Sequence, residues 1–546
     1  MLKRQSPLQT IAIAISLLLP SVILPRPTFA AQRIYASYAT LERSISVDAL
    51  EIYAKEGKIN DDLAAYAKYA EPRVMQQLRR VLLTRINLDA IAISQFFYTP
   101  QGEDLLQRIG QIIQTESRQT GIYALRSALV LAAADSEGLT LLNVLRHFPS
   151  NSIRVDLRRS LQLADQVETI INRTNSAVTS IARHSETEAN TGLKVDFSQL
   201  PDLRSSGRFQ WNKQTLTLND KRRDRVFIAD FYLPITSRPA PVIVISHGLA
   251  SDRNTLAYLA THLASYGFAV AVPEHPDSNT ERFRLLLTGR ASTADEPSEF
   301  INRPYDVTYL LDRLQALDDA DPTYQLNLNQ VGIIGQSFGG YTALALAGAP
   351  INFPQLQKDC KDRVNAWNIS LLLQCRALEL PVTQYNLRDP RIKAAIAINP
   401  LSNSVFGEDS LSKIKIPLMI VSSSNDTVAP ALSEQIIPFS WLTTDKKYLV
   451  LFEGGTHFSA LSEPDPATNP LALPFPIYGS HPTLVKRYMR ALSVAFSEVY
   501  VANDPQYLPY LSSNYTTAIA QSVSQVRLVQ SLPADLRSLV DAKLPK

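Results

Sequence analysis

A serine flanked by glycines is the residue of this sequence that most directly suggests chemistry. Gly335, Ser337 and Gly339 form a G-x-S-x-G pattern within VGIIGQSFGGYTALALAG, residues 331–348. An apolar run precedes the pattern and a run rich in Ala and Leu follows it, which predicts a strand, a sharp turn and a helix. So tight a turn excludes side chains two residues before and after the serine. The pattern therefore predicts a nucleophile elbow that exposes Ser337; a glycine-rich turn with an incidental serine is the alternative.

A serine hydroxyl becomes a useful nucleophile beside a general base, which in turn needs an orienting acid. Residues 417–421 form an apolar run that leads into a turn carrying Asp426. Residues 448–452 form another, which leads into a Gly-Gly loop carrying His457. The carboxyl ends of parallel strands meet at one edge of a sheet, where ligands bind. We therefore expect Ser337, Asp426 and His457 to act together as nucleophile, acid and base.

Other residues compete for the roles of base and acid. His481 is the only other histidine after Ser337, and it follows a proline-rich loop. His457 has the alternative interpretation of a surface loop residue, and Asp426 that of a turn-forming aspartate. Three further carboxylates rival Asp426 as the acid: Glu408, Asp409 and Glu453.

The elements that must position these residues alternate between strands and helices. Apart from the runs before Ser337, Asp426 and His457, apolar patterns predict strands at 214–218, 226–232, 242–245, 269–272 and 393–398. Helical patterns occur at 255–266, 302–317 and 482–501. Alternation at this spacing predicts the α/β class, with a mostly parallel, doubly wound sheet. We place this domain at residues 209–503.

The loop after the predicted strand 242–245 reads SHGL, residues 246–249. In α/β-hydrolases a loop at this place supplies one backbone N–H of an oxyanion hole, and the residue after the nucleophile supplies the other. The predicted donors are the N–H groups of Leu249 and Phe338, each worth about 3 kcal/mol of transition-state stabilisation. An ordinary glycine-containing loop is the alternative, and we interpret His247 as structural.

Residues 351–391 form an insertion between the predicted helix after Ser337 and the next strand. At this place an insertion would lie over the strand ends, so we interpret it as a cap. Its apolar run at 367–373 fits a fixed helix that packs on the core, which we favour, or a lid that opens on lipid. Cys360 and Cys375, the only cysteines, either pair in an oxidising compartment or remain buried thiols.

The N-terminal residues 1–30 predict a signal peptide, because Lys3 and Arg4 precede an apolar run and small residues end at Ala30. A retained anchor is the alternative. Helical periodicity over residues 31–182 predicts an all-α domain. The polar segment 183–208 predicts a linker, and residues 504–546 a polar tail without identifiable chemistry.

Composition restricts the function further. The chain has 546 residues, a formal net charge of +3, 19% charged residues and 45% apolar residues. These values are typical of globular domains and include no basic block suited to nucleic acid. The sequence contains no metal-ligand spacing, so we expect neither a metal nor an organic cofactor.

Residues 205–500 resemble the platelet-activating-factor acetylhydrolase and dienelactone hydrolase branch of the α/β-hydrolases. The matching pieces are SHGLAS, LASYGFAVAVPEHPDSN, RPYDVTYLLDRL and GQSFGG. The resemblance implies Ser337 as nucleophile and Leu249 and Phe338 as oxyanion-hole donors. One position departs: the acetylhydrolases carry the acid after the strand that follows the elbow helix, where this chain has Asn399. The acid is then expected one strand later, at Asp426, which weakens any transfer of acetylhydrolase substrate preference.

Residues 31–182 resemble a domain of unknown function that precedes exported cyanobacterial hydrolases, which implies no activity. The expected function is an exported, periplasmic or secreted, serine hydrolase that cleaves carboxylic esters of small molecules or lipids, as esterases and lipases do. The alternatives are a catalytically idle hydrolase fold used for binding, and cleavage of thioester, lactone or amide bonds. A peripheral membrane contact through the cap would accompany the lid interpretation; no protein partner is indicated.

Overall fold

The computed structural model describes residues 30–38, 40–192, 194–361, 368–462 and 475–536. These residues fall into two compact units. The first holds the described residues within Met1–Ala90 and Ile109–Arg158, and the second holds Ile91–Arg108 and the described residues from Arg159 onward. The predicted signal peptide, residues 1–30, lies outside the described residues except for Ala30.

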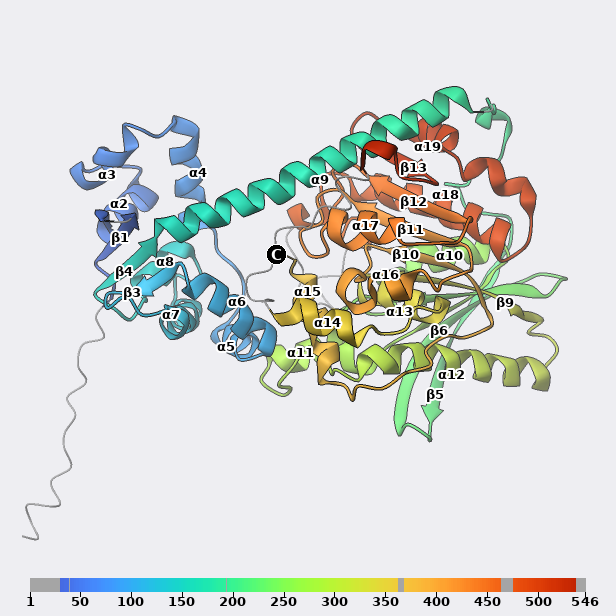
Figure 1. The fold of residues 1–546 in the computed structure, drawn as a ribbon. Coiled ribbons are helices and arrows are strands. Elements are labelled where there is room, and N and C mark those ends of the chain that lie inside the picture. The colour runs from blue at the N-terminus through green and yellow to red at the C-terminus, as the bar shows by residue number, and fades with distance from the viewer. Residues whose placement is uncertain (1–29, 39, 193, 362–367, 463–474, 537–546) are drawn as a thin grey trace, which may run out of the picture. The chain divides into compact units, whose positions relative to one another are not determined.

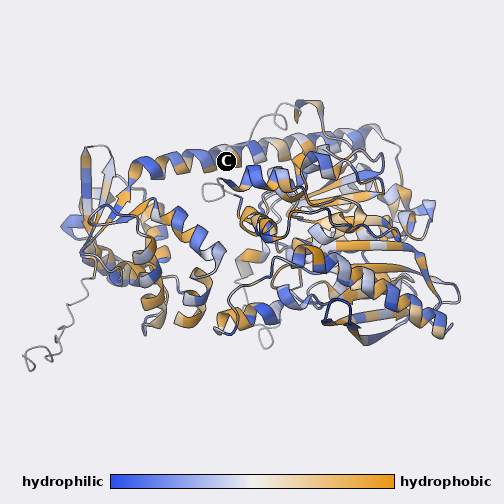
Figure 2. Cartoon of the chain, turned by 60° about the horizontal axis from the view of Figure 1, so that its bottom comes forward, coloured by the Kyte–Doolittle hydropathy of each residue, from blue (hydrophilic) through white to orange (hydrophobic). Residues whose placement is uncertain are grey.

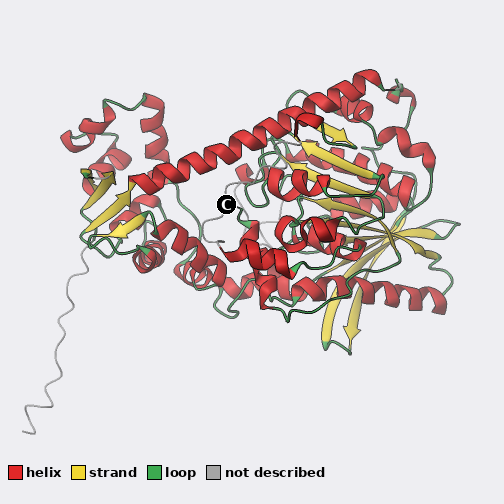
Figure 3. Cartoon of the chain, viewed as in Figure 1, coloured by secondary structure: helices red, strands yellow, loops and turns green. Residues whose placement is uncertain are grey.

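A nine-stranded sheet forms the centre of the described part of the second unit (Figures 1 and 3). Its order is β13-β12-β11-β10-β9-β7-β8-β6-β5, and the neighbours from β12 to β8 run parallel. The remaining pairs are antiparallel. The strands are β5 (Trp211–Asp220), β6 (Arg225–Pro234), β7 (Ala240–Ser246), β8 (Ala269–Pro273), β9 (Leu326–Gln336), β10 (Ile392–Ile398), β11 (Leu418–Ser423), β12 (Lys447–Phe452) and β13 (Val526–Val529).

Helices cover both faces of this sheet, because its central strands are apolar on both sides. Along β7, Val242 and Val244 share a core with α12 (Glu299–Ala320) and α13 (Phe338–Ala347). The alternate residues Ile243 and Ile245 share the opposite core with α10 (Ala257–Ser265) and α18 (Pro482–Tyr500). Figure 2 shows the apolar residues of these strands between the helices. The predicted doubly wound α/β sheet is confirmed.

The second unit contains further short helices that join these elements. They are α5 (Ala90–Phe97), α6 (Pro100–Gly110), α11 (Thr280–Leu287), α14 (Phe353–Asp359), α15 (Ser370–Gln374), α16 (Asn403–Leu411), α17 (Ile437–Ser440), α19 (Ser513–Ile519), η2 (Pro276–Ser278), η4 (Cys375–Glu379), η5 (Leu432–Ile436) and η7 (Pro505–Tyr510). Three of them, α14, α15 and η4, lie in the insertion between α13 and β10. The loops that follow β9, β10, β11 and β12 open at the carboxyl edge of the sheet.

The first unit contains a four-stranded sheet, so the predicted all-α domain at residues 31–182 is wrong. The sheet has the order β2-β1-β4-β3, with β1 antiparallel to β2 and parallel to β4. Its elements are β1 (Arg33–Tyr38), β2 (Leu41–Ser46), β3 (Ile113–Thr115), β4 (Ser152–Asp156), α2 (Val47–Glu56), α3 (Asp61–Ala67), α4 (Pro72–Leu83), α7 (Ile122–Ala134) and α8 (Leu141–Arg146). The strands are too short to show a clear period of two, and Ile113 and Ile153 also fit a helical spacing.

A single long helix, α9 (Leu157–Thr191), continues past residue 182, where we predicted the linker to begin. Its Ile181 is buried in the core of the second unit, and its Ser185 hydroxyl donates to the Leu528 carbonyl oxygen at 3.2 Å. Residues 183–191 are therefore helical and do not belong to a linker at 183–208. They are polar because the helix buries only a narrow face.

The predicted polar tail at 504–546 is also corrected, because part of it completes the sheet. β13 pairs antiparallel with β12, from Leu449 opposite Val529 to Phe452 opposite Val526. Tyr515 of α19 is buried in the same core as α18. β13 has only four residues and lies in a Ser-rich segment, so the sequence pattern did not indicate a strand. Residues 537–546 lie outside the described residues.

Candidate active site

Ser337 lies at the turn between β9 and α13, with backbone angles φ 56° and ψ −116°. A positive φ is strained for a residue that carries a side chain. A Cβ on Gly335 would lie 1.9 Å from the Gly339 carbonyl oxygen, and one on Gly339 would lie 2.0 Å from the Ser246 carbonyl oxygen. The backbone therefore passes too close at both glycines for any side chain, which confirms the predicted strand, sharp turn and helix.

The helix that follows Ser337 presents free N–H groups to the turn. Phe338 is the first residue of α13, so its backbone N–H has no acceptor within the helix. The Ser337 backbone N–H donates to the Ile398 carbonyl oxygen at 2.9 Å, which ties the turn to the end of β10. A negative charge that forms beside Ser337 would meet the positive end of this helix.

The loops after β11 and β12 bring Asp426 and His457 into contact. His457 Nδ1 lies 2.7 Å from Asp426 Oδ2, and both residues are buried. The other carboxylate oxygen, Oδ1, accepts from the backbone N–H groups of Val428 and Ala429 at 2.8 and 2.7 Å. Because the imidazole Nδ1–H is donated to the carboxylate, the ring presents Nε2 as an acceptor.

Gln336 links this pair to the serine turn. Its Nε2 donates to the His457 carbonyl oxygen at 3.1 Å, and the residue immediately precedes Ser337. Ser337, Asp426 and His457 follow β9, β11 and β12, which run parallel within the same sheet. The three predicted residues therefore lie at one edge of the sheet.

The rival acids and the rival histidine make other contacts. Glu453 Oε1 accepts from Arg527 Nε at 2.6 Å. Glu408 and Asp409 are exposed on α16, and His481 is exposed at the start of α18. Among these carboxylates, Asp426 is the one that contacts His457.

The loop 246–249 lies beside the serine turn, since a Cβ on Gly248 would lie 3.4 Å from Ser337 Cβ. His247 Nε2 accepts from the His275 backbone N–H at 3.0 Å, so Nδ1 carries the proton and donates to the Gly248 carbonyl oxygen at 2.8 Å. Burial holds the pKa of His247 well below its usual range, and the ring is neutral. His247 thus shapes the loop that carries Leu249.

Arg303 of α12 is a buried residue that we did not select from the sequence. Its Nη1 and Nη2 donate to the carbonyl oxygens of His247 and Gly248 at 2.6 and 3.3 Å. Its Cζ lies 4.4 Å from the centroid of the Phe338 ring. The Arg303 guanidinium therefore contacts both the loop 246–249 and Phe338, which carry the predicted oxyanion-hole donors.

Acidic residues balance this buried charge. Arg303 Nε lies 3.6 Å from Glu299 Oε2, and Arg225 donates to Glu299 at 2.7 Å and to Asp306 at 2.8 Å. His275 Nδ1 lies 2.9 Å from Asp306 Oδ2. Burial lowers the pKa of Arg303 to about 10, so the side chain remains charged at neutral pH. The sequence signal for this network is the i, i+4, i+7 spacing of Glu299, Arg303 and Asp306 on one helix face.

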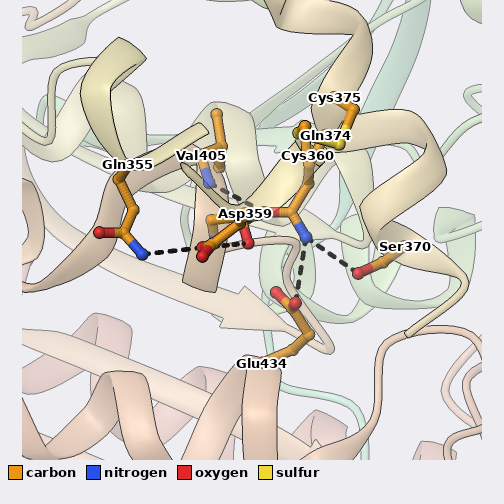
Figure 4. The surroundings of a disulfide bond; sticks show 9 residues. Gln355, Asp359, Cys360, Ser370, Gln374, Cys375, Val405 and Glu434 are labelled. Atoms are coloured by element: carbon orange, nitrogen blue, oxygen red, sulfur yellow. Dashed lines mark hydrogen bonds between the residues drawn. A yellow bond between two sulfur atoms is a disulfide. The ribbon is translucent and has the colours of Figure 1, made fainter. Parts of the chain in front are cut away.

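A disulfide joins Cys360 to Cys375 across the described part of the cap insertion 351–391 (Figure 4). The paired alternative is therefore confirmed.

Gln374, next to the disulfide, donates to Ser370 Oγ and Glu434 Oε1 and accepts from the Val405 backbone N–H. These bonds fasten the cap to α16 and η5.

The apolar residues of the cap pack inward. Leu371 and Leu373 of α15 are buried in the core that contains the α13 side chains. This packing supports the interpretation of a fixed helix, which we favoured over a lid. Trp367, which we placed in the same apolar run, lies outside the described residues.

Among the residues that the structure describes, no helix is both long and apolar enough to cross a membrane. Nor do three or more His, Cys, Asp or Glu side chains of those residues come together as metal ligands.

Two family models match separate parts of the chain. The family described as an alpha/beta hydrolase of unknown function matches residues 30–156. The family of platelet-activating factor acetylhydrolase, isoform II, matches residues 230–302, from β6 into α12. The first match covers the unit with the four-stranded sheet, and the second covers the loop 246–249.

Individual proteins match over longer stretches. Platelet-activating factor acetylhydrolase of Cavia porcellus is 26% identical over 227 residues, 35% of this chain and 43% of that protein. Cutinase est1 of Thermobifida alba is 22% identical over 301 residues, 54% of this chain and 72% of the cutinase. Cutinase 2 of Thermobifida cellulosilytica is 22% identical over 300 residues, 54% of this chain and 82% of the cutinase. Together with the doubly wound sheet and the glycine-bounded turn at Ser337, these matches show that the chain has the α/β-hydrolase fold.

Proposed function

We propose that the protein is an exported serine hydrolase that cleaves carboxylic esters, with Ser337 as nucleophile, His457 as general base and Asp426 as the orienting acid. The observation that carries this proposal is the buried contact between His457 Nδ1 and Asp426 Oδ2, 2.7 Å long, at the sheet edge where Ser337 sits in a strained turn. Such a contact selects the imidazole tautomer and stabilises the imidazolium. A fold used only for binding would need neither the contact nor the strain.

In the proposed reaction Ser337 Oγ attacks the ester carbonyl carbon while His457 Nε2 accepts the hydroxyl proton. The resulting oxyanion accepts hydrogen bonds from the backbone N–H groups of Leu249 and Phe338. The carbon–oxygen bond to the alcohol then breaks as His457 returns the proton to the leaving oxygen, which produces an acyl-enzyme. Water attacks the acyl carbon with His457 again as base. The bond from this carbon to Ser337 Oγ then breaks, His457 returns the proton to Oγ, and the carboxylic acid leaves.

Two independent features support export. The predicted signal peptide at residues 1–30 directs the chain across a membrane. The disulfide between Cys360 and Cys375 is of a kind that persists in oxidising compartments outside the cytosol. The choice of esters as the substrate class is supported by the relatives, which are named an acetylhydrolase and cutinases.

A fluorophosphonate probe tests the proposal on the chain from Ala31 onward, because it labels only an activated serine. We expect the unmodified protein to be labelled and to hydrolyse p-nitrophenyl esters, and Ser337→Ala to lose both properties. Asp426→Asn should lower the hydrolysis rate by about 10⁴-fold while the fold is retained. Asp409→Asn, which changes an exposed acid of α16, is the matched control and should behave like the unmodified protein.

The same experiment rejects the proposal in a defined way. A folded, unmodified protein that takes up no probe and hydrolyses no ester would favour the idle binding fold. Labelling that is lost in Ser337→Ala but unchanged in Asp426→Asn would move the acid away from Asp426. A series of acyl-chain lengths, run beside a thioester and an amide of the same acid, identifies the preferred bond.

A further inference from the structure

Asn399 directly follows β10, between the strand that leads to Ser337 and the strand that leads to Asp426. Only 1% of its surface is exposed, and its backbone φ is 44°. Its backbone N–H donates to the Val421 carbonyl oxygen of β11 at 2.8 Å. Asparagine tolerates this left-handed conformation better than most residues, so the turn is compatible with the side chain it carries.

The Asn399 side chain contacts the proposed acid. Its Nδ2 donates to Asp426 Oδ2 at 2.6 Å, and this is the same oxygen that contacts His457 Nδ1. Its Oδ1 accepts from Ser423 Oγ at 3.3 Å. Because the hydroxyl is a donor and the carboxylate an acceptor, the amide has one consistent orientation, with its NH₂ group toward Asp426.

We propose that Asn399 is a positioning residue for hydrolysis, which holds Asp426 Oδ2 in line with His457 Nδ1. This inference rests on the proposed function, because it assigns Asn399 a task within the same site. A hydrogen bond to a carboxylate is shorter and stronger than one between neutral groups. Oδ1 is already held by two backbone N–H groups, so Asn399 completes the support of the second oxygen.

The inference also explains why this chain has an amide where its relatives in the acetylhydrolase branch are expected to have the acid. A second carboxylate within hydrogen-bond distance of Asp426 would ionise together with it only at raised pH, because like charges this close disfavour each other. An amide donates to Asp426 without adding a charge. The residue after β10 therefore supports the acid, which in this chain lies after β11.

The ionisable groups near Asn399 come from the loops after β11 and β12 and from η5. Asp426 follows β11, and His457, which contacts it, follows β12. Glu434 of η5 is bound through Oε2 by the backbone N–H groups of Ser402 and Asn403, at 2.7 and 3.0 Å. Of these groups, Asp426 is the one to which the Asn399 side chain donates.

Asn399→Ala tests the positioning role, with Asn425→Ala as the matched control. Asn425 is an exposed asparagine that immediately precedes Asp426. Loss of one charge-assisted hydrogen bond is expected to lower kcat by roughly 10- to 100-fold. KM should change little, because Asn399 touches the acid and not the substrate, and Asn425→Ala should match the unmodified protein. An unchanged kcat in folded Asn399→Ala overturns the inference.

Asn399→Asp supplies a readout that a purely structural role would not affect. With one shared proton the new aspartic acid donates to Asp426 as the amide did, and activity is retained. As the pH rises this proton is lost, the two carboxylates repel each other, and kcat falls. We therefore expect an alkaline descending limb in the kcat profile of Asn399→Asp that the unmodified protein lacks. Identical profiles for the two proteins would contradict the inference.

A proton resonance separates failure of this inference from failure of the proposed function. The His457 Nδ1–H, when donated to a buried carboxylate, gives a low-field signal that does not depend on turnover. We expect this signal in the unmodified protein, a shifted signal in Asn399→Ala, and none in Asp426→Asn. If the protein hydrolyses no ester, these shifts still establish the contact from Asn399 through Asp426 to His457. If it hydrolyses esters and Asn399→Ala leaves both the signal and kcat unchanged, the positioning role alone is refuted.

Discussion

The Arg303 guanidinium, which has no exposed surface, donates a 2.6 Å hydrogen bond to the carbonyl oxygen of His247. A second bond of 3.3 Å reaches the carbonyl oxygen of Gly248. In a trans peptide the N–H points opposite to the carbonyl of the same plane. The Leu249 N–H, which shares a plane with the Gly248 carbonyl, therefore points away from Arg303. A helix residue more than fifty positions along the chain thus sets the direction of a proposed oxyanion-hole donor.

Arg303→Lys is expected to lower kcat by roughly 10- to 100-fold, which is less than the roughly 10²- to 10³-fold seen when one oxyanion-hole donor is removed, because the donor is misplaced and not lost. Lysine keeps the positive charge beside Glu299 but is a point donor that cannot hold two carbonyl oxygens in a fixed geometry. Steady-state hydrolysis of a p-nitrophenyl ester measures the effect. Arg284→Lys, at an exposed ion pair on α11, is the control and should leave kcat unchanged. A kcat equal to that of the unmodified protein would show that the loop 246–249 keeps its shape without the two hydrogen bonds from the Arg303 guanidinium.

Gly335→Ala is expected to abolish fluorophosphonate labelling of Ser337. The added Cβ would lie 1.9 Å from the Gly339 carbonyl oxygen, so the turn must open and Ser337 must move. Gly348→Ala at the other end of α13 is the comparison, because its Cβ would meet only the Arg388 side chain, 3.5 Å away. That variant carries backbone strain at φ 119°, which should cost about 1 kcal/mol or slightly more of folding stability. Labelling should survive there, and full labelling of Gly335→Ala would contradict the geometry of the turn.

Cys360→Ala with Cys375→Ala is expected to lower the free energy of unfolding by about 3 kcal/mol, the loop-entropy contribution for a separation of 15 residues. The mechanism is a larger number of conformations available to the unfolded chain. Urea unfolding of this double variant, beside the unmodified protein with and without a reducing agent, measures the difference. The reduced protein and the double variant should have similar midpoints. A reducing agent that leaves the midpoint of the unmodified protein unchanged would show that the disulfide adds no stability.

His262 is expected to make folding stability fall as the pH decreases below about 6.5, the ordinary pKa of histidine. Burial lowers the pKa of His262 to about 4 in the folded protein, where its Nε2 donates to the Leu203 carbonyl oxygen at 2.9 Å. The unfolded chain therefore takes up the proton first, and the contribution is full above pH 6.5 and is lost as the pH falls toward 4. The slope approaches about 1.4 kcal/mol per pH unit for one group.

His262→Gln isolates this contribution, because glutamine can donate from a similar position and does not titrate in this range. Chemical unfolding at several values between pH 7.5 and pH 5 should show the variant losing less stability than the unmodified protein over the same interval. Parallel stability curves for the two proteins would mean that His262 does not remain neutral in the folded state.

The central sheet and the residues at its edge could be predicted from the sequence for one physical reason. Strands buried on both faces are continuous apolar runs, as at 242–245 and 448–452, and such runs leave little ambiguity. Residues with catalytic side chains that directly follow such runs must then lie at the same edge. Asp426 and His457 each follow such a run, and the structure places the two in contact.

The first unit and the end of the chain could not be predicted in this way. β1 and β2 are half-exposed strands of six residues each, and β13 has four residues, so their patterns carry too few apolar positions to distinguish them from helix or loop. The buried ion pairs could not be predicted from the sequence for a different reason. Arg225 and Asp306 are 81 residues apart, and only the fold brings them to 2.8 Å. The amide of Asn399 could be noted as a departure, but its contact with Asp426 is a tertiary feature.

The pairing of β13 with β12 has a consequence for how the sheet is completed during folding. β12 and the His457 loop precede residues 526–529 in the chain, so until β13 pairs, β12 is the open edge of the sheet, with unpaired N–H and C=O groups. Open edges are the places where chains join one another and aggregate. The arrival of β13 closes this edge through the register from Leu449 opposite Val529 to Phe452 opposite Val526. The last of the described strands thereby closes the edge of the strand that leads to His457.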